Sequence, residues 1–71
     1  MGRMAGGYIT VNSVKIAVRG TWLKDGASLH FGDVLAELKE GQEVIVKYKV
    51  SEKWGPLALE IIAEEVRYVR G

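Results

Sequence analysis

The sequence predicts an all-β fold, a small five-stranded barrel formed by a single domain. Three observations favour it: two stretches in which apolar and polar residues alternate, an Asp-Gly pair between apolar runs, and a length of 71 residues. A chain of this length supports one hydrophobic core but not two, since it buries only about 60% of its unfolded surface. We expect residues 1–7 to form a flexible leader and residues 8–71 to form the barrel domain.

The first strands are expected from residue 8 onward. Residues 8–11 are β-branched or aromatic, as strands prefer, and Asn12 and Ser13 then favour a turn or a bulge. Residues 14–19 alternate, so that two valines and an isoleucine face one side while a lysine, an alanine and an arginine face the other. One face is therefore expected in the core and the other toward solvent or a ligand.

A β-hairpin is predicted over residues 21–31, because apolar runs at its two ends enclose Asp25 and Gly26. An Asp-Gly pair in this setting is among the stronger short-range hairpin signals. The Gly-Asp pair that follows offers a turn and a helix N-cap. The next segment, residues 34–38, fits either one helical turn or an irregular crossover.

Residues 43–51 alternate again and predict a strand, which ends before Gly55 and Pro56. The segment 57–71 is ambiguous, because the spacing of its apolar residues fits one stripe of a helix and also one face of a strand. We favour a strand, since a barrel needs one to close against residues 43–51. The alternative is an α+β domain in which a C-terminal helix packs on a small antiparallel sheet.

The composition excludes several classes of protein. The absence of cysteine excludes disulfides and thiolate metal sites and favours a cytoplasmic location. No apolar run approaches the roughly 20 residues that a membrane-spanning helix needs, and the first seven residues lack the apolar region of a signal peptide. Ten Lys and Arg against nine Asp and Glu leave a net charge of +1, so binding of a polyanion requires a local patch.

Catalysis is not expected from this sequence. Its one histidine, His30, lies two residues from Ser28 on a predicted strand, but a nucleophile relay also needs an orienting carboxylate. One histidine without cysteine does not supply the three or four ligands of a zinc site. The nine glycines form neither a dinucleotide-binding motif nor a P-loop. We therefore predict a binding module that is not an enzyme and that uses no cofactor.

The pattern that does indicate a function is the interleaving of aromatic and basic residues on the predicted strands and turns. Aromatic rings stack on bases, at about 1–3 kcal/mol each, and cations contact phosphates. Because stacking needs unpaired bases, the pattern favours single-stranded RNA or DNA over a duplex. The stacking candidates are Trp22, His30, Phe31 and Trp54, and the phosphate-contacting candidates are Arg19, Lys24, Lys47, Lys49 and Lys53.

These residues also have purely structural explanations. In a domain this small, Trp22 fits the core better than the surface. Lys47 and Lys49 fit a solvated strand face. Trp54 lies in a Gly-Pro loop with charged neighbours and is the best candidate for an exposed ring, although it could also cap the barrel.

The second half of the chain resembles a cold-shock domain. Residues 38–44, Leu-Lys-Glu-Gly-Gln-Glu-Val, are similar to the turn that precedes a strand in that family. Residues 51–56 resemble its Gly-Pro-containing loop, and residues 57–61 its closing strand. The resemblance covers about half of the chain and implies a barrel of the OB type, so the complete fold prediction is a small five-stranded OB-like barrel.

The first half matches the family's nucleic-acid-binding motifs only in part. His30 and Phe31 match the end of the second motif, Val-Phe-Val-His-Phe, in which Ser28 stands where the family has its first Phe. The first motif, Lys-Gly-Phe-Gly-Phe-Ile, is not matched, because residues 19–23 hold one aromatic residue where the family has two. The resemblance therefore supports an OB-type barrel more than it supports the family's nucleic-acid chaperone activity. From the aromatic and basic residues themselves, we predict binding of single-stranded nucleic acid with low sequence preference.

An alternative function is that of a protein-interaction or homo-oligomerisation module. The near-neutral charge and the 48% hydrophobic content favour it. An edge strand such as Tyr8–Val11, or the apolar C-terminal segment, would pair across a two-fold axis. If Ile45 and Ile62 both face outward, the exposed apolar patch supports this second function.

Overall fold

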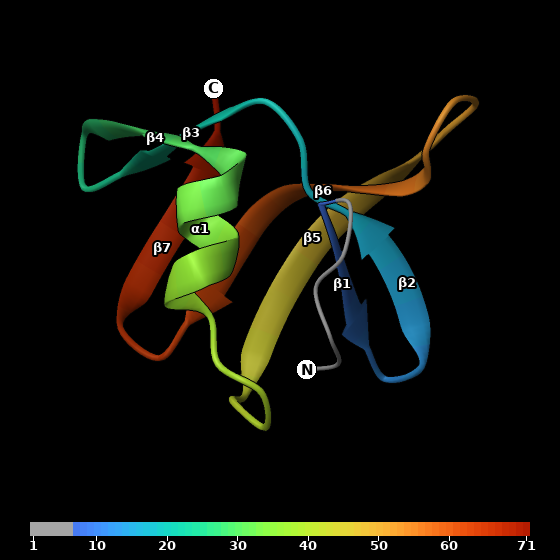
Figure 1. Cartoon of the computed structure of the whole chain (residues 1–71), viewed down its shortest axis with the longest axis horizontal. Helices are drawn as coiled ribbons and strands as arrows, with labels where there is room; N and C mark the ends of the chain where they lie inside the picture. Colours follow the sequence, from blue (N-terminus) through green and yellow to red (C-terminus); the bar gives the residue numbers. More distant parts are fainter. Residues whose placement is uncertain (1–6) are drawn as a thin grey trace.

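The computed structural model describes residues 7–71, which form one seven-stranded sheet and a short helix (Figure 1). The helix follows the second of two N-terminal hairpins, and three strands follow the helix. The elements are β1 (Tyr8–Val11), β2 (Val14–Ala17), β3 (Thr21–Lys24), β4 (Ala27–His30), α1 (Phe31–Glu37), β5 (Val44–Ser51), β6 (Gly55–Ala63) and β7 (Val66–Arg70).

Strand β6 is the centre of the sheet. It pairs with β5 along its whole length in the antiparallel sense, with a bulge between Lys47 and Tyr48. On its other side, the C-terminal half of β6 pairs with β7, and its N-terminal part meets β2 in parallel where Ala17 faces Leu57. β1 extends the sheet from β2, and β3 and β4 extend it from β7. In Figure 1 the β5–β6 hairpin therefore runs diagonally between the two smaller hairpins.

Two tight turns predicted from the sequence are confirmed. Asn12 and Ser13 join β1 to β2 with φ angles of 49° and 68°, and Asp25 and Gly26 join β3 to β4 with 50° and 84°. Positive φ at both central residues is the geometry of a type I′ turn, whose twist matches that of the strands it joins. These turns fix the register of both hairpins.

The core lies between the sheet and α1. Trp22 is its largest fully buried side chain, and α1 contributes Val34 and Leu35. The other members of the cluster are Ile9, Ile16, Val18, Leu38, Ala58, Ile61, Ala63 and Tyr68. Apolar side chains on both the strands and the helix therefore bury one another, as a single-core domain of this size requires.

The all-β prediction is confirmed in its general form, because the structure is mostly strand. The helical turn that the sequence allowed at residues 34–38 is α1, which begins three residues earlier. The C-terminal segment is strand in β6 and β7, so the α+β alternative with a C-terminal helix is wrong. Glu64, with a φ angle of 58°, turns the chain between these two strands.

Two details of the predicted fold differ in the structure. The sheet has seven strands among the described residues and is not closed into a barrel, because β1, β4 and β5 each have a strand partner on one edge only. Most of the predicted leader, residues 1–6, lies outside the described residues. Gly7 belongs to the folded domain, since it is buried and its carbonyl oxygen accepts a hydrogen bond from the Val18 amide at 2.6 Å.

Candidate functional site

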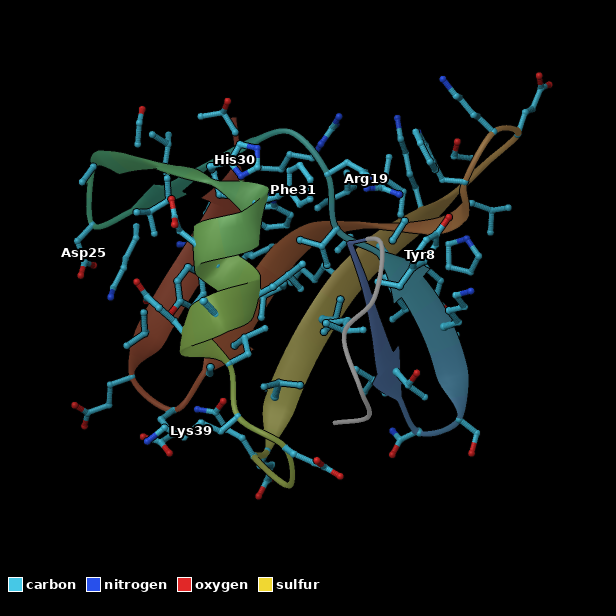
Figure 2. All side chains as sticks on the ribbon, viewed as in Figure 1. Tyr8, Arg19, Asp25, His30, Phe31 and Lys39 are labelled. Carbon is cyan, nitrogen blue, oxygen red and sulfur yellow. The ribbon has the colours of Figure 1, made fainter. Side chains whose placement is uncertain are left out.

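Four segments that are distant in sequence meet at one end of the molecule. They are the start of β1, the connection from β2 to β3, the junction of β4 and α1, and the tip of the β5–β6 hairpin. The register of the first hairpin places Tyr8 opposite Ala17, two residues before Arg19. Figure 2 shows Arg19 between Phe31 and Tyr8, with His30 beyond Phe31.

Arg19 lies at the centre of this end. Its guanidinium carbon is 4.4 Å from the centroid of the Trp54 ring, 5.2 Å from that of Tyr8 and 5.5 Å from that of Phe31. All three distances are within the range of a cation–π interaction, so the Arg19 guanidinium interacts with three aromatic rings. We call the surface formed by these side chains and their two neighbours the aromatic–basic patch: Tyr8, Arg19, His30, Phe31, Lys53 and Trp54.

Further side chains complete the patch and its border. The Lys53 ammonium lies 5.0 Å from the Trp54 ring centroid, and the rings of His30 and Phe31 are 4.3 Å apart with an interplanar angle of 34°. At the border, the Lys15 ammonium lies 4.3 Å from the centroid of the Tyr8 ring. The patch therefore combines aromatic rings with positively charged groups on one surface.

Backbone contacts hold Arg19 in this position. Its carbonyl oxygen accepts hydrogen bonds from Trp22 Nε1 at 3.0 Å and from Arg70 Nε at 3.2 Å. A Cβ atom on Gly7 would lie 2.5 Å from Arg19 Nη1 and 3.0 Å from the Phe31 ring, so a side chain at this position would displace the Arg19 guanidinium. Gly7 also has a φ angle of +77°, which side-chain-bearing residues rarely adopt.

Two side-chain hydrogen bonds shape the loops that carry the patch. Ser51 Oγ accepts hydrogen bonds from the Lys53 and Trp54 amides, both at 3.2 Å, and this fixes the tip of the β5–β6 hairpin. His30 Nδ1 accepts from the Gly32 amide at 3.0 Å and caps the N-terminus of α1. His30 therefore has a structural role as well as its place beside Phe31.

Five of the nine site residues predicted from the sequence come together in the patch: Arg19, His30, Phe31, Lys53 and Trp54. Trp22 does not belong to the binding surface, because its side chain is fully buried and no base can reach its ring. Trp22 supports the patch from the core, because its Nε1 donates a hydrogen bond to the Arg19 carbonyl oxygen.

The three remaining predicted lysines lie outside the patch. Lys24 forms an ion pair with Glu37 Oε1 at 2.7 Å. Lys47 lies 3.9 Å from Glu60, whose other carboxylate oxygen accepts from Arg67 at 2.6 Å. Lys49 is exposed on β5, two residues before the hairpin tip, so it lies nearest to the patch of the three.

Sequence reasoning misses Tyr8 and Lys15. The sequence pattern places Tyr8 on an edge strand considered for self-association, and Lys15 on a strand face turned toward solvent or a ligand. The signal that could have found them is the two-residue turn at Asn12 and Ser13, which pairs Tyr8 with Ala17 and so brings the ring close to Arg19.

The charges of the molecule are distributed unevenly along the β5–β6 ladder. The exposed acidic residues Glu40, Glu43, Glu64 and Glu65 lie at the end where Val44 pairs with Ala63. Arg19, Lys49 and Lys53 lie at the opposite end, with Glu52 as the acidic residue of the hairpin tip. Eight strand residues separate the two ends by about 26 Å, close to the full extent of the molecule.

A second polar cluster lies away from the patch and supports the fold. Glu37 Oε1 accepts hydrogen bonds from Lys24 Nζ and from the Tyr68 hydroxyl, both at 2.7 Å. The bond from Lys24, with that from Tyr68, holds the pKa of Glu37 below its ordinary value of 4.5. Burial, together with the bond to Glu37, raises the pKa of Tyr68.

The lowered pKa of Glu37 predicts a loss of stability in acid. A carboxyl group with a lowered pKa in the folded state stabilises that state above its unfolded pKa, and the contribution is lost as the pH falls through the folded value. The free energy of unfolding should therefore decrease below about pH 4.5, and by less in Glu37→Gln than in the unchanged chain. Urea denaturation between pH 7 and pH 3 measures this, with the exposed turn variant Glu65→Gln as the control. An equal decrease in Glu37→Gln and in the unchanged chain would contradict the assignment.

Other kinds of site are not apparent in the described part of the chain. Within residues 7–71, no group of three or more His, Cys, Asp or Glu side chains is close enough to hold a metal ion. Over the same residues, no helix has the length and apolar character needed to cross a membrane. Comparison of the chain with protein-family models, with curated proteins and with solved structures found no match, so its function must be inferred from the patch itself.

Proposed function

We propose that the chain binds single-stranded RNA or DNA through the aromatic–basic patch, with low sequence preference and without catalysis. The observation that supports this most is the gathering of Tyr8, Phe31 and Trp54, from three separate segments, around the single guanidinium of Arg19. Rings interleaved with cations on one surface are what sequence-tolerant binding of unpaired bases requires, because every base offers a π-face and every nucleotide a phosphate.

In the proposed complex, Trp54 is the main stacking residue. Its ring is half-buried at the hairpin tip, with Arg19 at 4.4 Å and Lys53 at 5.0 Å from its centroid. Lys53 is exposed, so a base can take its place against the ring while the ammonium moves to the adjacent phosphate. His30 and Phe31 extend the surface for a second base, and Lys49 and Arg70 at the border contact the backbone.

The uneven charge distribution supports binding at the end of the molecule that carries the aromatic–basic patch. Glu40, Glu43, Glu64 and Glu65 repel a polyanion from the far end of the β5–β6 ladder, whereas the cations of the patch attract it. A net charge of only +1 is therefore compatible with binding, provided that the bound strand is short or leaves the surface after the patch.

The proposal predicts salt-dependent quenching of tryptophan fluorescence by single strands. Titration with an oligonucleotide of about 15 nucleotides should quench Trp54, while Trp22 stays buried, and the same sequence as a duplex should bind much more weakly. With about three phosphates contacted, log K should fall with log salt concentration at a slope of about −2. No quenching at low salt, or affinity that is independent of salt, would show that the patch does not have this function.

The resemblance to cold-shock domains and to OB barrels stays a prediction. The structure is mostly strand, but its sheet is not closed into the barrel that this resemblance implies. His30 and Phe31, the two residues that match the second motif, both lie in the patch. These two residues connect the resemblance to the proposed function, because they are neighbours of Arg19 in space as well as part of that motif.

A second candidate function, protein interaction or homo-oligomerisation, is favoured by the apolar side chains on β5. Ile45, Tyr48 and Val50 are 61%, 49% and 78% exposed. Ile62, which faces Ile45 across the β5–β6 ladder, is half-buried. Exposure of large apolar side chains on a strand that lacks a partner on one edge is typical of an association surface.

A further inference from the structure

Strand β5 is the longest open edge of the sheet. Among the described residues it pairs with β6 alone, and its eight residues contain no proline that would block a new partner. The other edge strands, β1 and β4, have four residues each. The backbone N–H and C=O groups on an open edge form hydrogen bonds readily with an added strand.

A groove lies beside this strand. It has a volume of about 340 Å³ and lies between β5 and the β1–β2 hairpin. Its lining is mostly apolar and includes Val11, Val14, Val46 and Tyr48. An added strand would therefore form backbone hydrogen bonds on one side and cover apolar side chains on the other.

We propose that the partner of β5 is β5 of a second copy of this chain, paired antiparallel around a two-fold axis that passes through Val46. Side chains alternate between the two faces of a sheet, so residues that face each other must lie on the same face. In a symmetric antiparallel pair this condition places the axis at a residue, which then faces its own copy. The charges on β5 and next to it decide which residue that is.

Three of the symmetric registers bring lysines together. An axis at Lys47 or at Lys49 makes that lysine face itself, and an axis at Tyr48 makes Lys47 face Lys49. Like charges directly opposite one another destabilise a strand pair. These registers are therefore unfavourable.

With the axis at Val46, no two like charges of residues 43–49 face each other. This axis makes Glu43 face Lys49 of the second copy, and by symmetry Lys49 face Glu43, while Lys47 faces the exposed Ile45. Opposite charges directly across a strand pair are stabilising. The register extends over residues 43–49 of both chains.

An axis at Ile45 also brings opposite charges together, because it makes Glu43 face Lys47. It would need residues before 43 to be extended. Those residues form a turn instead, in which the Gln42 amide donates to the Lys39 carbonyl oxygen at 3.2 Å and Gly41 has a φ angle of +82°. This register therefore pairs fewer residues than the one at Val46.

Charge reversal tests both the dimer and its register. In sedimentation equilibrium without nucleic acid, the full chain should dimerise, and Glu43→Lys and Lys49→Glu should each be monomeric at the same concentration. An equimolar mixture of the two variants should dimerise again, because each lysine at 43 then faces a glutamate at 49. Glu65→Lys, a reversal in the β6–β7 turn outside the pairing, is the matched control and should dimerise like the unchanged chain.

The remaining outcomes overturn the proposal. A chain that is still monomeric at a concentration of about 1 mM, where an interface worth only about 4 kcal/mol would already be half-occupied, has no such interface. Dimers that survive both reversals use another surface, and variants that stay monomeric when mixed exclude the register at Val46. Circular dichroism of each variant checks that it is folded. Because nucleic acid is absent, none of these results depends on the function proposed for the aromatic–basic patch.

Discussion

Replacement of Trp22 by alanine is expected to lower the free energy of unfolding by about 3–5 kcal/mol. Trp22 is the largest fully buried side chain, and its removal leaves a cavity at the centre of the only core among the described residues. A 71-residue domain has a total stability of about 4–11 kcal/mol. The variant should therefore lose a large fraction of its stability and unfold at a much lower urea concentration than the unchanged chain.

Urea denaturation followed by far-UV circular dichroism measures this loss. Trp22→Phe should lose less, because it keeps most of the buried volume and removes only the hydrogen bond to the Arg19 carbonyl oxygen, which Arg70 also contacts. Leu23→Ala, at a side chain on β3 that is 40% exposed and outside the groove along β5, is the control and should change stability little. A loss below about 1 kcal/mol in Trp22→Ala would contradict the position of this side chain in the core.

Replacement of Trp54 by alanine is expected to weaken binding of single-stranded nucleic acid by about 5- to 150-fold. The range corresponds to the loss of one base–aromatic stack, about 1–3 kcal/mol. The ring also holds Arg19, at 4.4 Å, so its removal loosens the guanidinium around which the other two rings gather. We therefore expect an effect in the upper part of this range.

Fluorescence anisotropy of a labelled oligonucleotide measures the affinity without relying on the tryptophan that is removed. Tyr48→Ala serves as the matched control, because it also removes an exposed aromatic ring from the β5–β6 hairpin but lies outside the patch. Circular dichroism under the titration conditions verifies that both variants are folded. Equal affinities of Trp54→Ala and the unchanged chain would rule out stacking on Trp54.

The local fold could be predicted because its signals are local. Alternation over residues 43–51 predicted β5, and the two type I′ turns have residue types that favour positive φ. The turn between β6 and β7 carried no such signal, because Glu64 and Glu65 are not typical turn residues. The C-terminal segment was therefore ambiguous from the sequence, although it forms two strands.

The candidate site could be predicted only in part, because it depends on contacts between distant segments. Arg19 and Trp54 are separated by 35 residues (54 − 19) and meet because β6 contacts β2 where Leu57 faces Ala17. No sequence pattern indicates that contact. Nor does one indicate that Glu37 and Glu60 engage Lys24 and Lys47, which removes these lysines from the set of cations near the rings.

The unclosed sheet has a similar cause. The resemblance to cold-shock domains implied a closed barrel, and the length of β5 is compatible with closure. Closure would require β1 to pair with β5, yet β1 has only four residues and ends at the turn of Asn12 and Ser13. The open edge of β5 is what remains, and it is the surface from which we infer the dimer.

Mapping of the bound strand by NMR tests the central claim most directly. In two-dimensional ¹H–¹⁵N spectra of the 71-residue chain, addition of a single-stranded oligonucleotide at low salt should shift the amide signals of Tyr8, Arg19, Phe31, Lys53 and Trp54. The signals of Glu40, Glu43, Glu64 and Glu65, at the acidic end, should remain in place. Shifts confined to the acidic end or to β5 before the bulge, or no shifts at all, would contradict the assignment of nucleic-acid binding to the aromatic–basic patch.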